Sequence, residues 1–151
     1  MVTRNDGKKL ELAVQEALRF HQTTSKLHFF RMYDATSSGG RGHAQDGDFV
    51  WLLPNKAMLI ECKSTETSKD LLALIKSNSK NKQQLMRHKL WHLSGHSSLY
   101  VYGNLLSQQV ATYTGESVME MVSTGNESPP LTAGSFKTTQ QQLWKIAASG
   151  D

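Results

Sequence analysis

The sequence lacks the features of several large protein classes. Its one cysteine, Cys62, cannot form an internal disulfide, and no cysteine and histidine spacing typical of a zinc site occurs, which argues against a disulfide-stapled domain and a zinc finger. No apolar run reaches the roughly 18 residues that cross a membrane, so no membrane partner is expected. The polar and basic first residues have no apolar core of a secretory signal. We therefore expect a cytoplasmic protein. The small size and the lack of accessory domains suit a prokaryotic protein or one encoded by a phage and made in a host cytoplasm.

The composition fits one globular domain. Apolar residues make up 38% of the 151 residues and charged residues 20%, which suits a single core over residues 1–151. The formal net charge is +4, a surplus that favours a polyanionic partner such as DNA. A charge of this size does not identify the partner, so the function has to be inferred from a site.

Hydrophobic spacing in the first part of the chain predicts a helix and a hairpin. Apolar residues three and four apart predict an amphipathic helix from about Lys8 to His21. An aromatic-rich segment, 27–33, predicts a strand, and residues 34–47, rich in glycine and serine, predict a loop. Strands over 48–53 and 57–63, joined by Pro54-Asn55-Lys56, predict an antiparallel hairpin.

The second part of the chain predicts more helix and two further strands. The pattern is helical over 68–94, with a polar break near 77–79 and Gly95 after its end, and strands are expected over 99–102 and 109–113. Residues 124–151 read as a C-terminal extension that carries a short helix over 137–148, so the core extends over about 7–113. This order predicts an α/β fold with a central mixed five-stranded sheet flanked by helices.

The predicted hairpin brings three charged side chains together. Because strand side chains alternate between faces, Glu61 and Lys63 point one way and Cys62 points the other. Asp48 begins the preceding strand and pairs roughly opposite Glu61 and Lys63. The alternative interpretation of Glu61 and Lys63 is a solvated ion pair on an edge strand, although a structural strand gains nothing from turning both charges inward.

Two carboxylates and a lysine at one place favour a divalent metal. Neighbouring carboxylates repel unless a cation lies between them, and Mg²⁺ prefers oxygen ligands. The backbone carbonyl of Cys62 offers one more oxygen. A metal there lowers the pKa of a bound water and neutralises charge on a phosphate, and Lys63 orients or helps to deprotonate that water, or stabilises the phosphorane. The pattern predicts phosphodiester hydrolysis with Mg²⁺, for which Mn²⁺ substitutes.

These residues resemble a known superfamily. Asp48, a hairpin and then Glu61-Cys62-Lys63 are similar to the motif of the PD-(D/E)XK nucleases. The segment from Gly7 to Glu11 is similar to the Gly-x-x-x-Glu of archaeal Holliday-junction resolvases of the Hjc type. Arg31, followed by Ser38-Gly39-Gly40, resembles the Arg and Ser-Gly stretch of that family.

The resemblance continues downstream of the motif. Gln84-Leu85, then Gly95 and the strand over 99–102, are similar to the helix and last core strand of Hjc and RecU resolvases, so the resemblance covers about two-thirds of the chain. The usual Pro-Asp of the family is Gly47-Asp48 here, which leaves Asp46 as a competing candidate for the metal aspartate. Asp48 fits better because it adjoins the apolar strand.

The resemblance implies a restriction-endonuclease-like core and assigns roles to residues. Glu11, Asp48 and Glu61 would bind metal, Lys63 would be the catalytic lysine, and Gln84 would lie near the site. An ordinary carboxylate near the helix start is the alternative for Glu11, for which Glu16 also competes. Gln83 competes with Gln84. A homodimer is implied too, because resolvases of this type bring two active sites to the two strands of a four-way junction.

Further basic and hydroxyl side chains are candidates for DNA contacts, since such groups bind phosphates. They are Lys9, Arg31, Ser38, Arg41, Lys82 and Arg87. A plain linker is the alternative for the loop over 34–47, and a solvated helix face is the alternative for Lys82 and Arg87. His88 and His92 stand four positions apart on the predicted helix, but with no third ligand they predict a surface or partly buried pair.

Three tryptophans, Trp51, Trp91 and Trp144, are expected in the core rather than stacked on bases.

The leading prediction is a structure-selective, metal-dependent endodeoxyribonuclease of the Holliday-junction resolvase type, acting on four-way DNA junctions. The first alternative is another small PD-(D/E)XK nuclease, such as a restriction-type or repair nicking enzyme. The second is a non-catalytic DNA-binding module with a decayed site, against which the intact Asp48, Glu61 and Lys63 argue.

Overall fold

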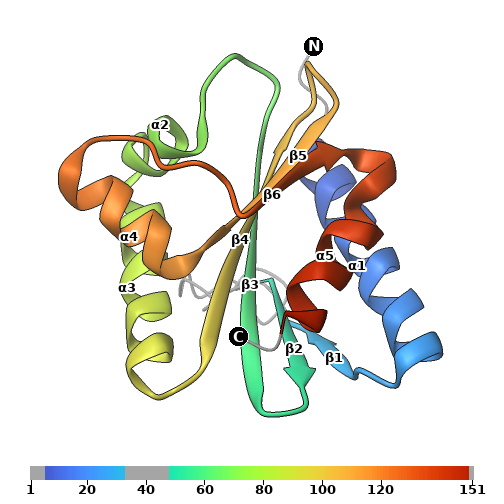
Figure 1. Cartoon of the computed structure of the whole chain (residues 1–151). Coiled ribbons are helices and arrows are strands. Elements are labelled where there is room, and N and C mark those ends of the chain that lie inside the picture. The colour runs from blue at the N-terminus through green and yellow to red at the C-terminus, as the bar shows by residue number, and fades with distance from the viewer. Residues whose placement is uncertain (1–5, 33–47, 150–151) are drawn as a thin grey trace, which may run out of the picture.

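A mixed sheet separates two layers of helices (Figure 1). The computed structural model describes residues 6–32 and 48–149. In that part of the chain the six strands lie side by side in sequence order, β1 to β6; β3 and β4 are parallel and every other neighbouring pair is antiparallel. Helices α1 and α5 cover one face of the sheet, and α2, α3 and α4 cover the other.

The elements in chain order are α1 (Asp6–Ser25), β1 (Phe29–Arg31), β2 (Phe49–Leu53), β3 (Lys56–Thr65), α2 (Leu71–Lys76), α3 (Ser79–Leu93), β4 (Ser97–Asn104), β5 (Gln109–Thr114), α4 (Gly115–Thr124), β6 (Thr132–Ser135), η1 (Phe136–Thr138) and α5 (Thr139–Ala148). The α/β class and the mixed sheet agree with the sequence prediction.

Each face of the sheet has its own apolar core. The predicted stripe of α1 is buried at Leu10, Val14 and Leu18, and it packs with Ile60 of β3 and with α5. On the other face Tyr100 of β4 packs with apolar residues of α2, α3 and α4. The alternation of side chains along β3 and β4 therefore directs Ile60, Cys62 and Val101 to the core of α1 and α5, and Tyr100 to the core on the other face.

The tryptophans do not all lie in the core. Trp51 is fully buried and Trp91 is partly buried, whereas 43% of Trp144 is exposed. The core prediction is therefore wrong for Trp144, whose ring stacks on that of His21 of α1 with the centroids 5.5 Å apart.

Side-chain caps explain where the helices of the crossover between β3 and β4 begin. Asp70 accepts a hydrogen bond from the Ala73 amide at the start of α2, and Asn78 accepts one from the Lys80 amide at the start of α3. The predicted break at 77–79 is confirmed. Gly95 follows α3 with a φ of +91°, a conformation that favours glycine.

The C-terminal part of the chain differs from the sequence prediction. The sheet has six strands rather than five, because Thr132–Ser135 forms β6 along β5. Helix α4 was not expected, whereas the predicted terminal helix is present as α5. Strand β6 extends the sheet and α5 completes the core on the face of α1, so residues 132–148 are part of the fold rather than an extension outside it.

None of the helices in the described residues is long and apolar enough to cross a membrane.

Candidate active site

Asp48 lies where strand β2 begins, next to the middle of β3. The last residue pair of these strands is Phe49 with Ile60, which confirms the predicted hairpin and places Asp48 beside Glu61. The amide of Cys62 lies beyond this pair and donates a 2.6 Å hydrogen bond to Asp48 Oδ2. The Asp48 carboxylate therefore takes the place of a strand partner, and its position is fixed by the backbone of the Glu61-Cys62-Lys63 segment.

Asp48 and Glu61 form a buried pair of carboxyl groups. Only 7% of Asp48 and 2% of Glu61 are exposed, and the two groups are hydrogen-bonded to each other. Burial, and then the charge of Glu61, raises the pKa of Asp48 to about 7. Burial also raises the pKa of Glu61 to about 7, against the opposing effect of Lys63. The pair therefore holds a proton near neutral pH unless a cation approaches.

The two oxygens of Glu61 face different nitrogen groups. Oε2 lies 3.8 Å from Lys63 Nζ, and Oε1 lies 3.7 Å from His88 Nε2. Within the described part of the chain, Oε1 accepts no hydrogen bond although it is buried. A buried carboxylate oxygen without a donor is costly, and a cation would satisfy it.

Lys63 is held by two side-chain amides of α3. Its Nζ donates to Gln84 Oε1 at 2.6 Å and to Asn81 Oδ1 at 2.7 Å. Gln84 thus lies at the site, as expected, whereas its competitor Gln83 is exposed on α3. Asn81 was missed, although it stands three residues before Gln84 and so lies on the same helix face.

Glu11 lies near this pair but is bound elsewhere. Its Oε1 is 3.3 Å from the guanidinium of Arg31, which also donates a 2.8 Å hydrogen bond to Gln15. The charge of Glu11 is among the causes that raise the pKa of Glu61. Among residues 6–32 and 48–149, however, no group of three His, Cys, Asp or Glu side chains is placed to hold a metal ion. The alternative residue Glu16 is exposed.

Three residues beside Glu61 were not predicted to belong to the site. His88 of α3 is fully buried, so its interpretation as a surface or partly buried residue is wrong. Its Nδ1 is hydrogen-bonded to Ser98 Oγ at 2.8 Å, and its ring lies 4.7 Å from that of Tyr100, the β4 neighbour of Glu61. The sequence carried a signal for the burial of His88, though not for its place at the site, because His88 shares a helix face with Leu85, which is buried.

The remaining predicted residues are dispersed around the site or outside the described residues. Lys9 and Lys82 are exposed, and Arg87 is partly buried. Ser38, Arg41 and Asp46 lie outside the described residues. The Cys62 side chain packs against the core of α1 and α5, on the other face from Glu61, and burial raises the pKa of its thiol.

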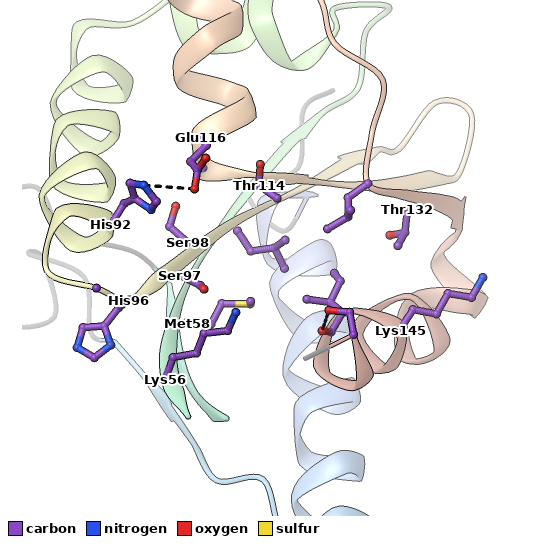
Figure 2. Close-up of a pocket in the computed structure, with 16 residues that line it drawn as sticks. Lys56, Met58, His92, His96, Ser97, Ser98, Thr114, Glu116, Thr132 and Lys145 are labelled. Atoms are coloured by element: carbon purple, nitrogen blue, oxygen red, sulfur yellow. Dashed lines mark hydrogen bonds and ion pairs between the residues drawn. The ribbon is translucent and has the colours of Figure 1, made fainter. Parts of the chain in front are cut away.

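A cavity of about 630 Å³ lies away from this carboxylate pair, toward the start of β3 and β4 (Figure 2). Its lining includes Met58, Leu99 and Ile146 together with Lys56 and Lys145, and at its border Glu116 Oε1 lies 3.2 Å from His92 Nε2. The cavity contains none of the residues that the sequence analysis assigned to the site. Ser98 lines it and also contacts His88.

A comparison of the chain with models of protein families found no family that matches, and a comparison with curated protein sequences found no match.

Proposed function

We propose that this protein is a metal-dependent endodeoxyribonuclease with a restriction-endonuclease-like core, selective for branched DNA and of the Holliday-junction resolvase type. The observation that carries the proposal is the buried Asp48–Glu61 pair with Lys63 beside it. Three ionisable groups turned inward at one point of a sheet reduce stability, and such arrangements cluster at functional sites. The single cysteine also suits the cytoplasmic setting expected for such an enzyme.

The donor set fits Mg²⁺ or Mn²⁺. Asp48 and Glu61 supply carboxylate oxygens, the Cys62 carbonyl is adjacent, and Glu61 Oε1 is buried without a hydrogen-bond donor in the described residues. Mg²⁺ is usually held by one or two carboxylates with waters and substrate phosphate oxygens completing its shell. Glu11, whose Oε1 lies 3.3 Å from Arg31, is a candidate for a further carboxylate ligand from α1.

When bound, the metal would acidify water and offset charge on the phosphate. The chain's own residues account for the rest of the reaction. Asp48 is aligned by the Cys62 amide, and Lys63 is aligned by Asn81 and Gln84, so its ammonium group can face a phosphate oxygen. In the reaction a water molecule loses a proton as its oxygen bonds to phosphorus, one P–O ester bond breaks, and the departing oxygen takes up a proton.

Selectivity for four-way junctions and the homodimer belong to the same proposal. Symmetric cleavage of a junction needs two active sites related by a two-fold axis, which a dimer provides. Light scattering of the purified protein would give about twice the chain mass of 16.9 kDa for the dimer.

The decisive experiment is cleavage of a labelled four-way junction beside linear duplex of the same sequence, with Mg²⁺, Mn²⁺ or EDTA. We expect metal-dependent cuts in the junction and few in the duplex, and no cuts by Asp48→Ala or Lys63→Ala. Equal cutting of both DNAs would favour a restriction-type or repair nuclease. Binding without cutting in either metal would favour a DNA-binding module, and full activity of Asp48→Ala would place the site elsewhere.

A further inference from the structure

We propose that His88 is a positioning residue that holds Glu61 in the orientation needed to bind the metal, an inference that rests on the proposed function. The inference depends on three side chains, from three different elements, that contact one another in series. Ser98 of β4 contacts His88 of α3, and His88 faces Glu61 of β3.

The imidazole faces the one oxygen of Glu61 that lacks a hydrogen bond in the described residues. His88 Nε2 is 3.7 Å from Oε1, a little beyond hydrogen-bond reach, while Lys63 is 3.8 Å from Oε2. The imidazole of His88 and the ammonium group of Lys63 thus each lie beside a different oxygen of Glu61, and together they limit rotation of its carboxylate. Outer groups that fix a metal-binding carboxylate in this way typically change metal affinity when they are removed.

The imidazole itself is fixed on two further sides. Ser98 Oγ is hydrogen-bonded to Nδ1 at 2.8 Å, and the Tyr100 ring lies 4.7 Å away. Ser98 is in turn confined by the start of α4, where a Cβ added to Gly115 would come within 1.8 Å of Ser98 Oγ. Figure 2 shows Ser98 beside Thr114 and Glu116 at this helix start. His88 is therefore set in a fixed orientation with Nε2 toward Glu61.

Two conservative substitutions separate positioning from packing. In His88→Gln the side-chain nitrogen reaches the place of Nε2 and can still face Glu61 Oε1. In His88→Asn the shorter amide reaches the place of Nδ1 and can contact Ser98 but not Glu61. Both variants bury a side-chain amide. If His88 served only to fill space or to contact Ser98, His88→Gln would bind Mn²⁺ no better than His88→Asn.

The primary measurement is Mn²⁺ affinity by isothermal titration calorimetry on the folded full-length proteins, with cleavage of the four-way junction measured in parallel. We expect His88→Asn to weaken Mn²⁺ binding by about 10- to 100-fold and His88→Gln by much less, since losses of this size follow removal of groups that orient metal ligands. Ser98→Ala should weaken binding in the same direction but less than His88→Asn. Cleavage rates measured at saturating Mn²⁺ should recover in both His88 variants.

Equal Mn²⁺ affinity in wild type and His88→Asn would overturn the positioning role, even if the wild type cuts DNA. The same holds if His88→Gln binds Mn²⁺ no better than His88→Asn. If the wild type binds Mn²⁺ but cuts no DNA, the proposed nuclease fails while the affinity series still decides the role of His88. If the wild type binds no Mn²⁺, both the inference and the metal-dependent mechanism fail.

Discussion

The buried carboxyl groups of Asp48 and Glu61 link the candidate site to the stability of the fold. Both have a pKa of about 7 in the folded chain, above the ordinary value of an exposed carboxyl group. Between about pH 4 and pH 7 the folded chain therefore binds protons that the unfolded chain has released. The free energy of unfolding falls as the pH rises through this window, and above it the unneutralised pair weakens the fold.

Replacing one carboxyl group of this pair should stabilise the protein while removing the proposed nuclease activity. At pH 8, we expect Asp48→Asn to raise the free energy of unfolding by about 1 to 3 kcal/mol, because a neutral amide replaces a buried charge. The amide oxygen can still accept from the Cys62 amide. Urea denaturation at pH 4.5 and pH 8 tests this, and the gain should shrink at the lower pH. Glu120→Gln, an exposed carboxylate of α4, is the control, and a less stable Asp48→Asn at pH 8 would contradict the argument.

The contact between Gln84 and Lys63 gives a second prediction at the residue scale. Gln84→Ala removes one of the two amide oxygens that hold the ammonium group, and we expect cleavage to slow by about 10-fold, corresponding to about 1.4 kcal/mol. Gln83→Ala, a change to the exposed neighbour, should leave the rate unchanged. Similar losses in both variants would mean that the effect comes from α3 as a whole.

Among the elements, those with a strong period or a local cap could be predicted from the sequence. The stripe of α1 and the apolar run of β3 are periodic signals, and the break between α2 and α3 coincides with Asn78, a residue suited to capping. Asp48, Glu61 and Lys63 followed from the hairpin and the two-residue alternation of its strands. Gln84 followed from a resemblance rather than from periodicity.

Elements stabilised by distant contacts escaped prediction. Strand β6 reads Thr132-Ala-Gly-Ser, with hardly any apolar side chain, and it is a strand because β5 pairs with it and Thr112 contacts Thr132. Helix α4 did carry local signals that went unused: the Thr114 cap, the Val118 and Met121 spacing, and Gly125 after its end. His88 could not be assigned to the site, because its partner Ser98 comes from a strand whose position depends on the crossover.

The cap of α4 allows a test at this scale. Thr114 accepts a hydrogen bond from the Ser117 amide at 3.1 Å, and we expect Thr114→Ala to lower the free energy of unfolding by about 1 kcal/mol. Thr114→Ser keeps the hydroxyl and should cost much less. Chemical denaturation of the two variants measures the difference, and equal losses would show that the methyl group matters more than the cap.

For the whole molecule, the distribution of charge on α3 suggests how DNA could approach the site. The helix turns Gln84 and Asn81 inward to Lys63 and leaves Lys82, between them in sequence, exposed. Lys82 lies beside Met119 and Glu120 of α4, so a DNA backbone that reached Lys63 would have to extend across α3 to contact Lys82. The net charge of +4 agrees with such a track without locating it.

The salt dependence of DNA binding tests whether Lys82 contacts a phosphate. For Lys82→Ala we expect weaker binding to the junction. In a plot of the logarithm of the binding constant against the logarithm of the salt concentration, the slope should be shallower by about 0.9, the value for one lost phosphate contact. Lys137→Ala, which removes an exposed lysine from η1, should leave the slope unchanged. An unchanged slope in Lys82→Ala would place the DNA on another surface. Anisotropy titrations at several salt concentrations provide the measurement.

The packing of α1 against α5 also has a consequence for how the chain is made. The stripe at Leu10, Val14 and Leu18 is part of the core that Leu143 and Ile146 complete, and His21 contacts the carbonyl of Gln140 at 2.9 Å. A ribosome needs on the order of ten seconds to add the residues between these helices. Throughout that time the nascent chain carries an apolar stripe without its final cover. Chaperones that bind exposed apolar segments should therefore engage α1 during synthesis and release it once α5 has emerged.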